Sequence, residues 1–448
     1  MQKTSGFLDA GVVKGVPGRG GSSGNGTRSR RSPERGFSLL VILAFFLLLS
    51  IVFTRPLLIQ GSHATVRDPY DPTLQAWTLA WEMRVLARNP FNLFNANIFY
   101  PNRYTLAYTD NQITNGVLAI PINAATDNPV LAQNLMVIFN LFLCGLGAYM
   151  LVVYLTRNKL AGVIGGIAYA FAPSRLAHLV HLHLCSAGWI PLSLLFLHKY
   201  SEEGRRRDAA LFALFFTLQT LATFYYGFIL SVAVMLFLLV RLVMNPKGYT
   251  LKWTLTLAVA LLVAVLLIIP FALPYLKLNR SDPRFRWKSG ELDLFSADIT
   301  DFLAAPPENM VWGKITGPLA RRTIPRGGPT ERTLFPGLLP LVLGACGAAY
   351  LFRKGKGSLR FYARFYVALA ALAFVMCLGS SLYLFGRRFD VPMPYELFYH
   401  IFPGFKALRV PARFIILISL SLAVLSGFAV KAMLGRLSKG SRPALAAA

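Results

Sequence analysis

Acidic residues are scarce in this chain, and none of them interrupts a long apolar run. The 448 residues include 19 Asp and Glu against 46 Lys and Arg, and charged residues of all kinds make up only 15% of the chain. Carriers driven by protons or ions usually need an ionisable side chain at mid-membrane depth. The lack of such acids argues against an ion-coupled transporter, although it leaves room for a protein that handles lipids.

Cysteine is also rare, with four residues in the whole chain. These are Cys144, Cys185, Cys346 and Cys377, which lie within or beside apolar runs and show no ligand spacing. Packing is therefore their expected role, and the pattern indicates neither a disulfide framework nor a metal cluster. No cofactor follows from the sequence, and a divalent metal held by loop carboxylates stays an open alternative.

Apolar residues dominate what is present. The chain is 55% hydrophobic, and its mean hydropathy is +0.52, far above that of a soluble protein of this length. We therefore predict an all-α polytopic membrane protein. Runs near the length that crosses a bilayer predict about ten transmembrane helices, at 37–54, 130–155, 160–177, 183–198, 208–223, 225–244, 251–272, 334–352, 362–385 and 412–431.

The distribution of Lys and Arg predicts a cytoplasmic N-terminus. With this orientation every short basic loop faces inward, provided that two ambiguous stretches are assigned correctly. Residues 113–126, interrupted by Pro121, must lie along the outer surface as a helix that does not cross. Residues 208–244 must form two helices, broken near Thr223.

The same topology divides the chain into three parts. Residues 1–36, rich in Gly, Ser and Arg, are expected to be a disordered cytoplasmic segment. Residues 37–435 form the transmembrane domain, and 436–448 form a cytoplasmic tail. Three outer loops can hold a site: a first loop (55–129), a second loop (274–333) and a third loop (386–411).

The outer loops carry more Lys and Arg than Asp and Glu, which suits phosphate-bearing lipid headgroups. The basic residues are dispersed over loops on both sides of a membrane, and this argues against nucleic acid as a partner. The second loop is rich in Pro and Gly and long enough to order over a substrate, although a solvated connector would look the same. A short surface helix is expected at 296–303, where Asp298 or Asp301 would help to bind an acceptor.

Three carboxylates of the first loop, Asp68, Asp71 and Asp110, are candidates for catalysis. Asp71-Pro72 is typical of a helix start, with Asp at the N-cap and Pro at the first helical position. Trp77 and Trp81 then follow on one face of an amphipathic helix expected to lie in the membrane interface. Asp71 is therefore either a cap or a general base, with a second acid to orient an acceptor or a metal.

Cations and histidines supply a second group of candidates. Arg175, Arg409 and Arg413 stand near outer ends of predicted spans, where they either bind phosphate or extend from the bilayer into the interface. His178 and His181 are one helical turn apart, whereas His183 points elsewhere if the helix continues. Hydrogen bonding within the protein, contact with substrate and, less consistent with the spacing, zinc binding are the alternatives for these histidines.

The chain resembles the GT-C superfamily of integral membrane glycosyltransferases, which includes protein O-mannosyltransferases and aminoarabinose transferases. It is most similar to bacterial members of the superfamily. The resemblance covers roughly residues 37–435 and rests on these stretches: Asp71-Pro72 with Trp77 and Trp81, Asn95-Ala96-Asn97-Ile98-Phe99-Tyr100-Pro101, Thr105-Leu106-Ala107-Tyr108, Ala172-Pro173-Ser174-Arg175 with His178 and His181-Leu182, and Arg409-Val410-Pro411-Ala412-Arg413-Phe414.

The resemblance implies an inverting transferase in the bacterial inner membrane, with its active site on the outer face. Its donor would be a sugar on polyprenyl phosphate, its acceptor a glycan, lipid or protein, and its base Asp71, with Asp68 next. The Asp-Glu pair of the O-mannosyltransferases is missing here, which leaves the acceptor open. A non-catalytic carrier or flippase of lipid-linked glycan, or a membrane assembly partner, are the alternatives; an enzyme requires carboxylates and arginines to converge in one outer cavity.

Overall fold

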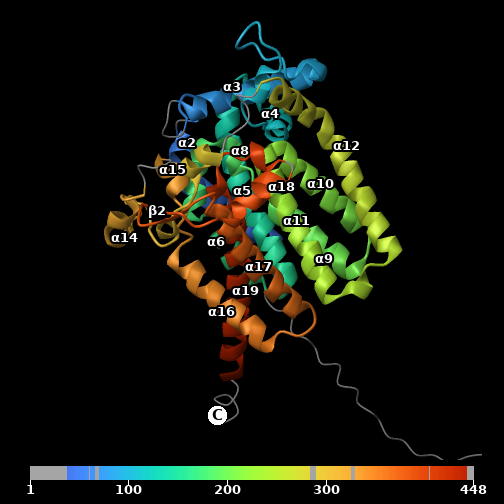
Figure 1. The fold of residues 1–448 in the computed structure, drawn as a ribbon, viewed down its shortest axis with the longest axis vertical. Coiled ribbons are helices and arrows are strands. Elements are labelled where there is room, and N and C mark those ends of the chain that lie inside the picture. Colours follow the sequence, from blue (N-terminus) through green and yellow to red (C-terminus); the bar gives the residue numbers. More distant parts are fainter. Residues whose placement is uncertain are drawn as a thin grey trace, which may run out of the picture. The chain divides into compact units, whose positions relative to one another are not determined.

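The computed structural model describes residues 38–59, 61–65, 70–282, 289–323, 328–402 and 404–440. Helices dominate this part of the chain (Figure 1). Ten of them overlap the predicted spans. They are α1 (Leu39–Phe53), α5 (Pro129–Thr156), α6 (Lys159–Ala170), α9 (Trp189–Glu203), α10 (Arg206–Ala222), α11 (Phe224–Met244), α12 (Leu251–Ser281), α16 (Leu338–Lys354), α17 (Ser358–Cys377) and α19 (Ile415–Gly440).

The remaining α-helices and the strands are short or lie between the long helices. They are α2 (Arg55–Ile59), α3 (Asp71–Arg88), α4 (Ile113–Thr126), α7 (Pro173–Ala177), α8 (Leu182–Cys185), α13 (Ser289–Leu292), α14 (Gly313–Ala320), α15 (Gly328–Arg332) and α18 (Pro394–Ile401), with one antiparallel hairpin of β1 (Leu382–Leu384) and β2 (Arg387–Phe389). The all-helical membrane fold is thereby confirmed.

Five of the described helices, α5, α11, α12, α17 and the last helix from Pro411, are long and apolar enough to cross a membrane, and the bent pair of α6 with 173–180 would add a sixth. The total of about ten crossings stays a prediction. Where the ends of the predicted spans differ, loop geometry is the reason: the span expected to end at 385 stops at Cys377, because the chain then turns into the β1–β2 hairpin.

Helix α19 lies at the centre of the bundle and packs on α5, α6, α16 and α17. Close approach explains two of the glycines. A Cβ at Gly347 of α16 would lie 1.8 Å from the Leu425 carbonyl oxygen of α19, and one at Gly166 of α6 would lie 2.4 Å from the ring of Phe46. Small residues at helix contacts are typical of membrane bundles, because they let the backbones approach.

Helix α12 lies at one edge of the bundle, against α10 (Figure 1). Much of its apolar surface has no protein cover: Val259, Leu262 and Leu266 are each more than half exposed. A soluble protein rarely leaves so large an apolar face open to water. This face of α12 fits contact with lipid chains.

The first loop is anchored to the bundle by buried polar contacts. Gln133 of α5 donates from Nε2 to the Pro72 carbonyl oxygen at 3.1 Å and so fixes the start of α3. Asn115 of α4 donates to Ser186 Oγ at 2.8 Å and accepts from Asn140 Nδ2 at 3.0 Å. The predicted helix at 113–126 is therefore present, but half of it is packed against the bundle.

Two local predictions are wrong in detail. Helix α3 begins at Asp71 itself, with Tyr70 at the N-cap, so Asp71 is the first helical residue and not the cap. At 296–303 a short 3-10 helix, Ile299–Phe302, is buried and not on the surface. Asp298 caps it, accepting from Thr300 N at 2.8 Å, so Asp298 acts within the loop.

Candidate functional site

Six segments far apart in the sequence line one cavity of about 420 Å³. They are the start of α3, Thr109, the stretch between α7 and α9, Phe295, helix α15, and the approach to α19. Helices α5, α6 and α19 pack against one another, and this packing brings segments that are far apart in the sequence to the same cavity. The ionisable and imidazole side chains that line the cavity are Asp71, His181, His183, Glu331, Arg409 and Arg413.

Asp71 reaches the cavity with its side chain 49% exposed. His181 Nε2 lies 3.0 Å from Asp71 Oδ2. Since a carboxylate can only accept, we assign the proton of this hydrogen bond to Nε2. Burial, with the charge of Arg413, lowers the pKa of His181, so the imidazole is neutral near pH 7. The contact holds an accessible carboxylate at the edge of the cavity.

The other histidines extend this contact in two directions. His178 Nδ1 lies 3.4 Å from His181 Nδ1, and His183 Nδ1 lies 2.9 Å from Gln75 Oε1 of α3. One continuous helix would have pointed His183 away. The helix instead breaks after Ala177, and the chain turns through 178–180 before α8. All three rings therefore lie together, with the ring centres of His178 and His183 at 5.5 and 5.8 Å from that of His181.

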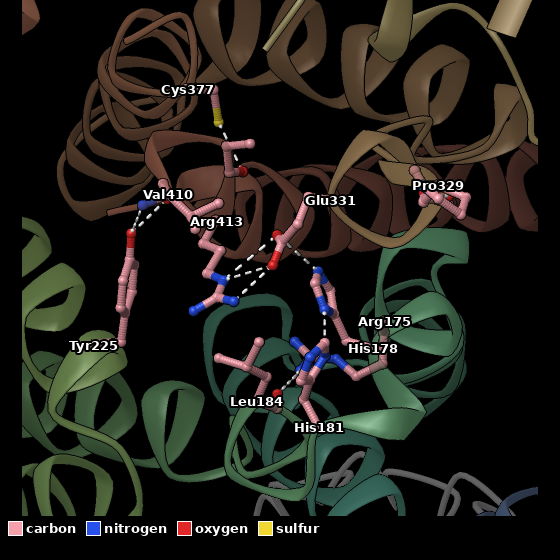
Figure 2. Close-up of polar contacts among 12 residues, drawn as sticks. Arg175, His178, His181, Leu184, Tyr225, Pro329, Glu331, Cys377, Val410 and Arg413 are labelled. Atoms are coloured by element: carbon pink, nitrogen blue, oxygen red, sulfur yellow. Dashed lines mark hydrogen bonds and ion pairs between the residues drawn. The ribbon is translucent and has the colours of Figure 1, made fainter. Parts of the chain in front are cut away.

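Glu331 and Arg413 form the strongest ion pair of the cavity (Figure 2). Glu331 Oε1 lies 2.6 Å from Arg413 Nη2 and 3.2 Å from its Nε, while Oε2 lies 3.6 Å from His178 Nε2. Burial alone would raise the pKa of the Glu331 carboxyl. The charges of Arg413 and His178 outweigh burial and lower that pKa to about 2, so Glu331 stays ionised.

Glu331 is the residue that sequence reasoning missed. It follows Gly328 and Pro329 in the second loop and carries no local signal of its own. A neighbouring contact fixes it in place: Arg332 Nη1 pairs with Asp301 Oδ2 at 3.0 Å, and its Nη2 donates to the Leu294 carbonyl oxygen at 2.9 Å. These bonds tie α15 to the part of the second loop around Leu294 and Asp301, and so help to hold Glu331 at the cavity.

The two arginines of the third loop and α19 differ in their surroundings. The Arg409 guanidinium lies 4.6 Å from the centre of the Phe295 ring at the exposed side of the cavity. Arg413 is half-buried and lies 4.9 Å from the centre of the Tyr225 ring. Tyr225 is itself held by the third loop, because its hydroxyl contacts both N and O of Val410, at 2.6 and 2.5 Å. Two guanidiniums therefore face the space beside Asp71.

Arg175 does not line the cavity. It is 5% exposed, donates from Nη1 to the Leu184 carbonyl oxygen at 3.1 Å, and lies over the Tyr169 ring at 5.1 Å (Figure 2). These contacts brace the turn that presents the histidines. Its phosphate-binding role, predicted from its place near a span end, receives no support from this position.

Asp110 also lies away from the cavity lining. Its carboxylate accepts from Phe224 N at 3.1 Å, Tyr225 N at 3.5 Å and the Thr223 hydroxyl, which makes it the cap of α11. Burial raises the pKa of Asp110, and these hydrogen bonds oppose the increase. Asp68, the third predicted acid, lies outside the described residues.

Metal binding can be tested on the donor sets present. Within the six described ranges, no group of three or more His, Cys, Asp or Glu is placed to hold a metal ion. Asp71, His181, His178 and Glu331 are near one another, but each is engaged in a hydrogen bond or ion pair with the next.

A family model matches almost the whole sequence and not the residues of this site alone. It is described as a domain of unknown function, DUF6311, and matches residues 34–448. The chain belongs to the DUF6311 family. A search of curated proteins finds no match for it.

Solved structures show which fold this DUF6311 chain has. It is similar to the archaeal oligosaccharyltransferase AglB from Archaeoglobus fulgidus, solved with an inhibitory peptide and a dolichol-phosphate, with a TM-score of 0.51 and 15% identity. The match covers 90% of this chain but 51% of AglB, so the chain spans about half the length of that protein. A second match is to ArnT from Cupriavidus metallidurans in the apo state, with a TM-score of 0.39, 14% identity, and 87% and 76% of the two chains covered. The likeness to AglB confirms the GT-C fold.

Proposed function

We propose that the chain is an inverting glycosyltransferase that moves a sugar from a polyprenyl-phosphate donor to an acceptor hydroxyl or amide. The observation that carries the proposal is convergence: one accessible carboxylate, Asp71, and two guanidiniums, Arg409 and Arg413, share one cavity. A carrier without chemistry has no need of a base beside its phosphate site. The fold shared with AglB, a protein named as an oligosaccharyltransferase and solved with dolichol-phosphate, also supports it.

Each group has a task in this reaction. Asp71 takes the proton of the acceptor as the acceptor oxygen or nitrogen attacks the anomeric carbon, and His181 holds the carboxylate in position. Arg413 and Arg409 stabilise the charge that grows on the departing phosphate. The acceptor attacks from the side opposite the phosphate, so the configuration of the sugar inverts.

The proposal also sets a location. In this proposal the cavity lies on the outer face of a bacterial inner membrane, with the N-terminus in the cytoplasm and the donor in the bilayer, and the distribution of Lys and Arg supports this orientation. The lipid-facing surface of α12 fits a protein of this kind. Fusing a reporter that is active only outside the cytoplasm to the second loop, after Met310, tests the location. Activity of the reporter supports it, and inactivity with full expression contradicts it.

The reaction is tested with a panel of radiolabelled polyprenyl-phosphate sugars in membranes that carry the wild type, Asp71→Asn or Asp127→Asn. Asp127 is a matched control, because it is an exposed acid of the same loop at a φ of 48°, a conformation that Asn tolerates. We expect transfer by the wild type and the control, and transfer lowered by a factor of about 10² to 10⁴ in Asp71→Asn at equal expression. Undiminished transfer by Asp71→Asn would place the base elsewhere, and no transfer from any donor would contradict the proposal.

A further inference from the structure

The cavity holds as many carboxylates as guanidiniums. Asp71 and Glu331 are set against Arg409 and Arg413, and burial lowers the pKa of both lining histidines, His181 and His183, so that they stay neutral. The lining charges therefore cancel. The negative charge of Glu331 opposes a bound phosphate, so a cavity that only bound phosphate tightly would have the two arginines and no buried acid.

The donor and the lipid product differ in charge at the phosphate. A sugar attached through polyprenyl phosphate is a phosphodiester and carries one negative charge at any ordinary pH. After transfer, the carrier is a phosphomonoester, whose second ionisation lies near pH 6 by analogy with phosphorylated side chains, so it carries mostly two charges at pH 7. A site can separate the two ligands by this charge alone.

We propose that Glu331 is a specificity-determining residue that lets the cavity accept the phosphodiester donor and expel the phosphomonoester product. The proposal rests on the proposed function. Glu331 occupies Nε and Nη2 of Arg413, which leaves the Nη1 side of that guanidinium to meet a phosphate. The side chain is 10% exposed, so water and salt screen its charge little. The Arg332–Asp301 pair prevents α15 from moving the carboxylate away.

The charges can be followed through one turnover. The bond between the anomeric carbon and the phosphate oxygen breaks, its electron pair stays on that oxygen, the new bond forms to the acceptor, and the acceptor proton moves to Asp71. With donor bound, the cavity and ligand together carry one negative charge. Directly after transfer they still carry one, because the phosphate has gained a negative charge and Asp71 has lost its own by taking up the acceptor proton. Once Asp71 returns its proton to water, they carry two, with Glu331 beside the dianion, and the product leaves.

Binding measurements on purified protein in lipid nanodiscs test this role. The probes are a polyprenyl phosphate, which is a monoester with a second ionisation, and its methyl ester, which is a diester and has none. In Glu331→Gln we expect affinity for the monoester to rise about tenfold or more, which corresponds to about 1.4 kcal/mol of binding free energy. Affinity for the methyl ester should rise less. Product inhibition of transfer should strengthen in parallel. Glu308→Gln is the matched control, since Glu308 is an exposed acid of the same loop outside the cavity.

Equal changes for both probes in Glu331→Gln would overturn the role of Glu331, as would the same selectivity change in Glu308→Gln. Glu331→Gln leaves Arg413 without its partner and is prone to misfolding, so Glu331→Asp, which keeps the charge, is measured beside it and should retain the wild-type preference.

The wild type offers a test that needs no variant. From about pH 5.5 to about pH 8 its affinity for the monoester should fall as the ligand loses its second proton, relative to the methyl ester. The methyl ester does not change charge in this range, so its affinity reports any effect of titrating protein groups. The groups that face Glu331 are Arg413 from the approach to α19, and His178 and His181 from the turn before α8. A ratio that does not change with pH would overturn the proposal. If transfer proceeds while the ratio is flat, only the role of Glu331 fails; if neither lipid binds and no sugar moves, the proposed function fails.

Discussion

Asp71 and Asp110 belong to the same loop and look alike in sequence, yet they lie in opposite environments. The Asp71 carboxylate is half-exposed at the edge of a cavity, with one imidazole contact. The Asp110 carboxylate is surrounded by donors from the start of α11 and does not line that cavity. An acid with free access can exchange protons with a substrate, whereas an acid whose lone pairs are filled by backbone N–H groups stabilises a helix end.

Arg413 and Arg175 repeat the contrast among the cations. Both lie near helix ends. Arg413 lines the cavity and pairs there with Glu331, whereas the guanidinium of Arg175 contacts the Leu184 carbonyl oxygen and the Tyr169 ring. In each pair, the residue that lines the cavity is the one for which we propose a role in transfer. The following variants test that distinction.

The largest expected difference is between Asp71→Asn and Asp110→Asn. Losing a general base costs about 10² to 10⁴ in rate, so Asp71→Asn should lower transfer by that factor while its unfolding temperature stays that of the wild type. Asp110→Asn should retain transfer per folded molecule. Initial rates at saturating donor, with thermal unfolding of the same preparations, measure both. Loss of transfer in folded Asp110→Asn would remove the contrast.

Removing the Arg413 guanidinium should affect both stability and activity. In Arg413→Gln the buried Glu331 carboxylate loses its partner, and breaking a buried pair costs about 3–5 kcal/mol. The double variant with Glu331→Gln should recover most of that free energy of unfolding without recovering transfer. A double-mutant cycle in denaturant measures the coupling. Recovery of transfer in the double variant would show that Arg413 is structural, like Arg175.

Glu82, a buried acid of α3 near Asp110, should make stability depend on pH. Burial is the main cause that raises its pKa from 4.5 to about 8, with a smaller increase from Asp110. Because the folded state holds the proton and the unfolded state loses it, stability should fall by about 1.4 kcal/mol per unit as pH rises through this window. Glu82→Gln should lose this dependence. Unfolding temperatures from pH 5 to about pH 8 provide the measurement, and parallel curves for both proteins would contradict the assignment.

Loss of the α11 cap gives the smallest effect. Asp110→Ala removes the acceptor of Phe224 N and Tyr225 N and should cost about 1–2 kcal/mol of stability, as other N-cap deletions do. Asp110→Asn keeps an acceptor oxygen and should cost less. Hydrogen exchange of the first turn of α11 measures the effect locally. Protection that is unchanged in Asp110→Ala would show that Thr223 alone secures this helix start.

The sequence by itself determined the class of fold and the approximate positions of the long helices, although several of their ends differ by four or more residues. Apolar runs of membrane length must satisfy their backbone internally, so they form helices wherever they pack. Even the difficult break at Thr223 was predicted, because an apolar stretch too long for one helix had a polar and aromatic interruption. The amphipathic helix after Asp71 was likewise visible from its periodicity, although its first residue was misplaced by one position.

Only the tertiary structure decided which polar residues share a site. Glu331 gave no signal in the sequence, because its importance arises from Arg413, more than 80 positions away in the chain, and from the turn that carries His178. Asp110 and Arg175 had residue types that suit a catalytic site, but both lie away from the cavity lining, where Asp110 accepts from the start of α11 and Arg175 donates to the Leu184 carbonyl oxygen. Residue type and spacing set what a side chain can do, whereas burial and partners, which depend on long-range packing, decide whether it meets a substrate.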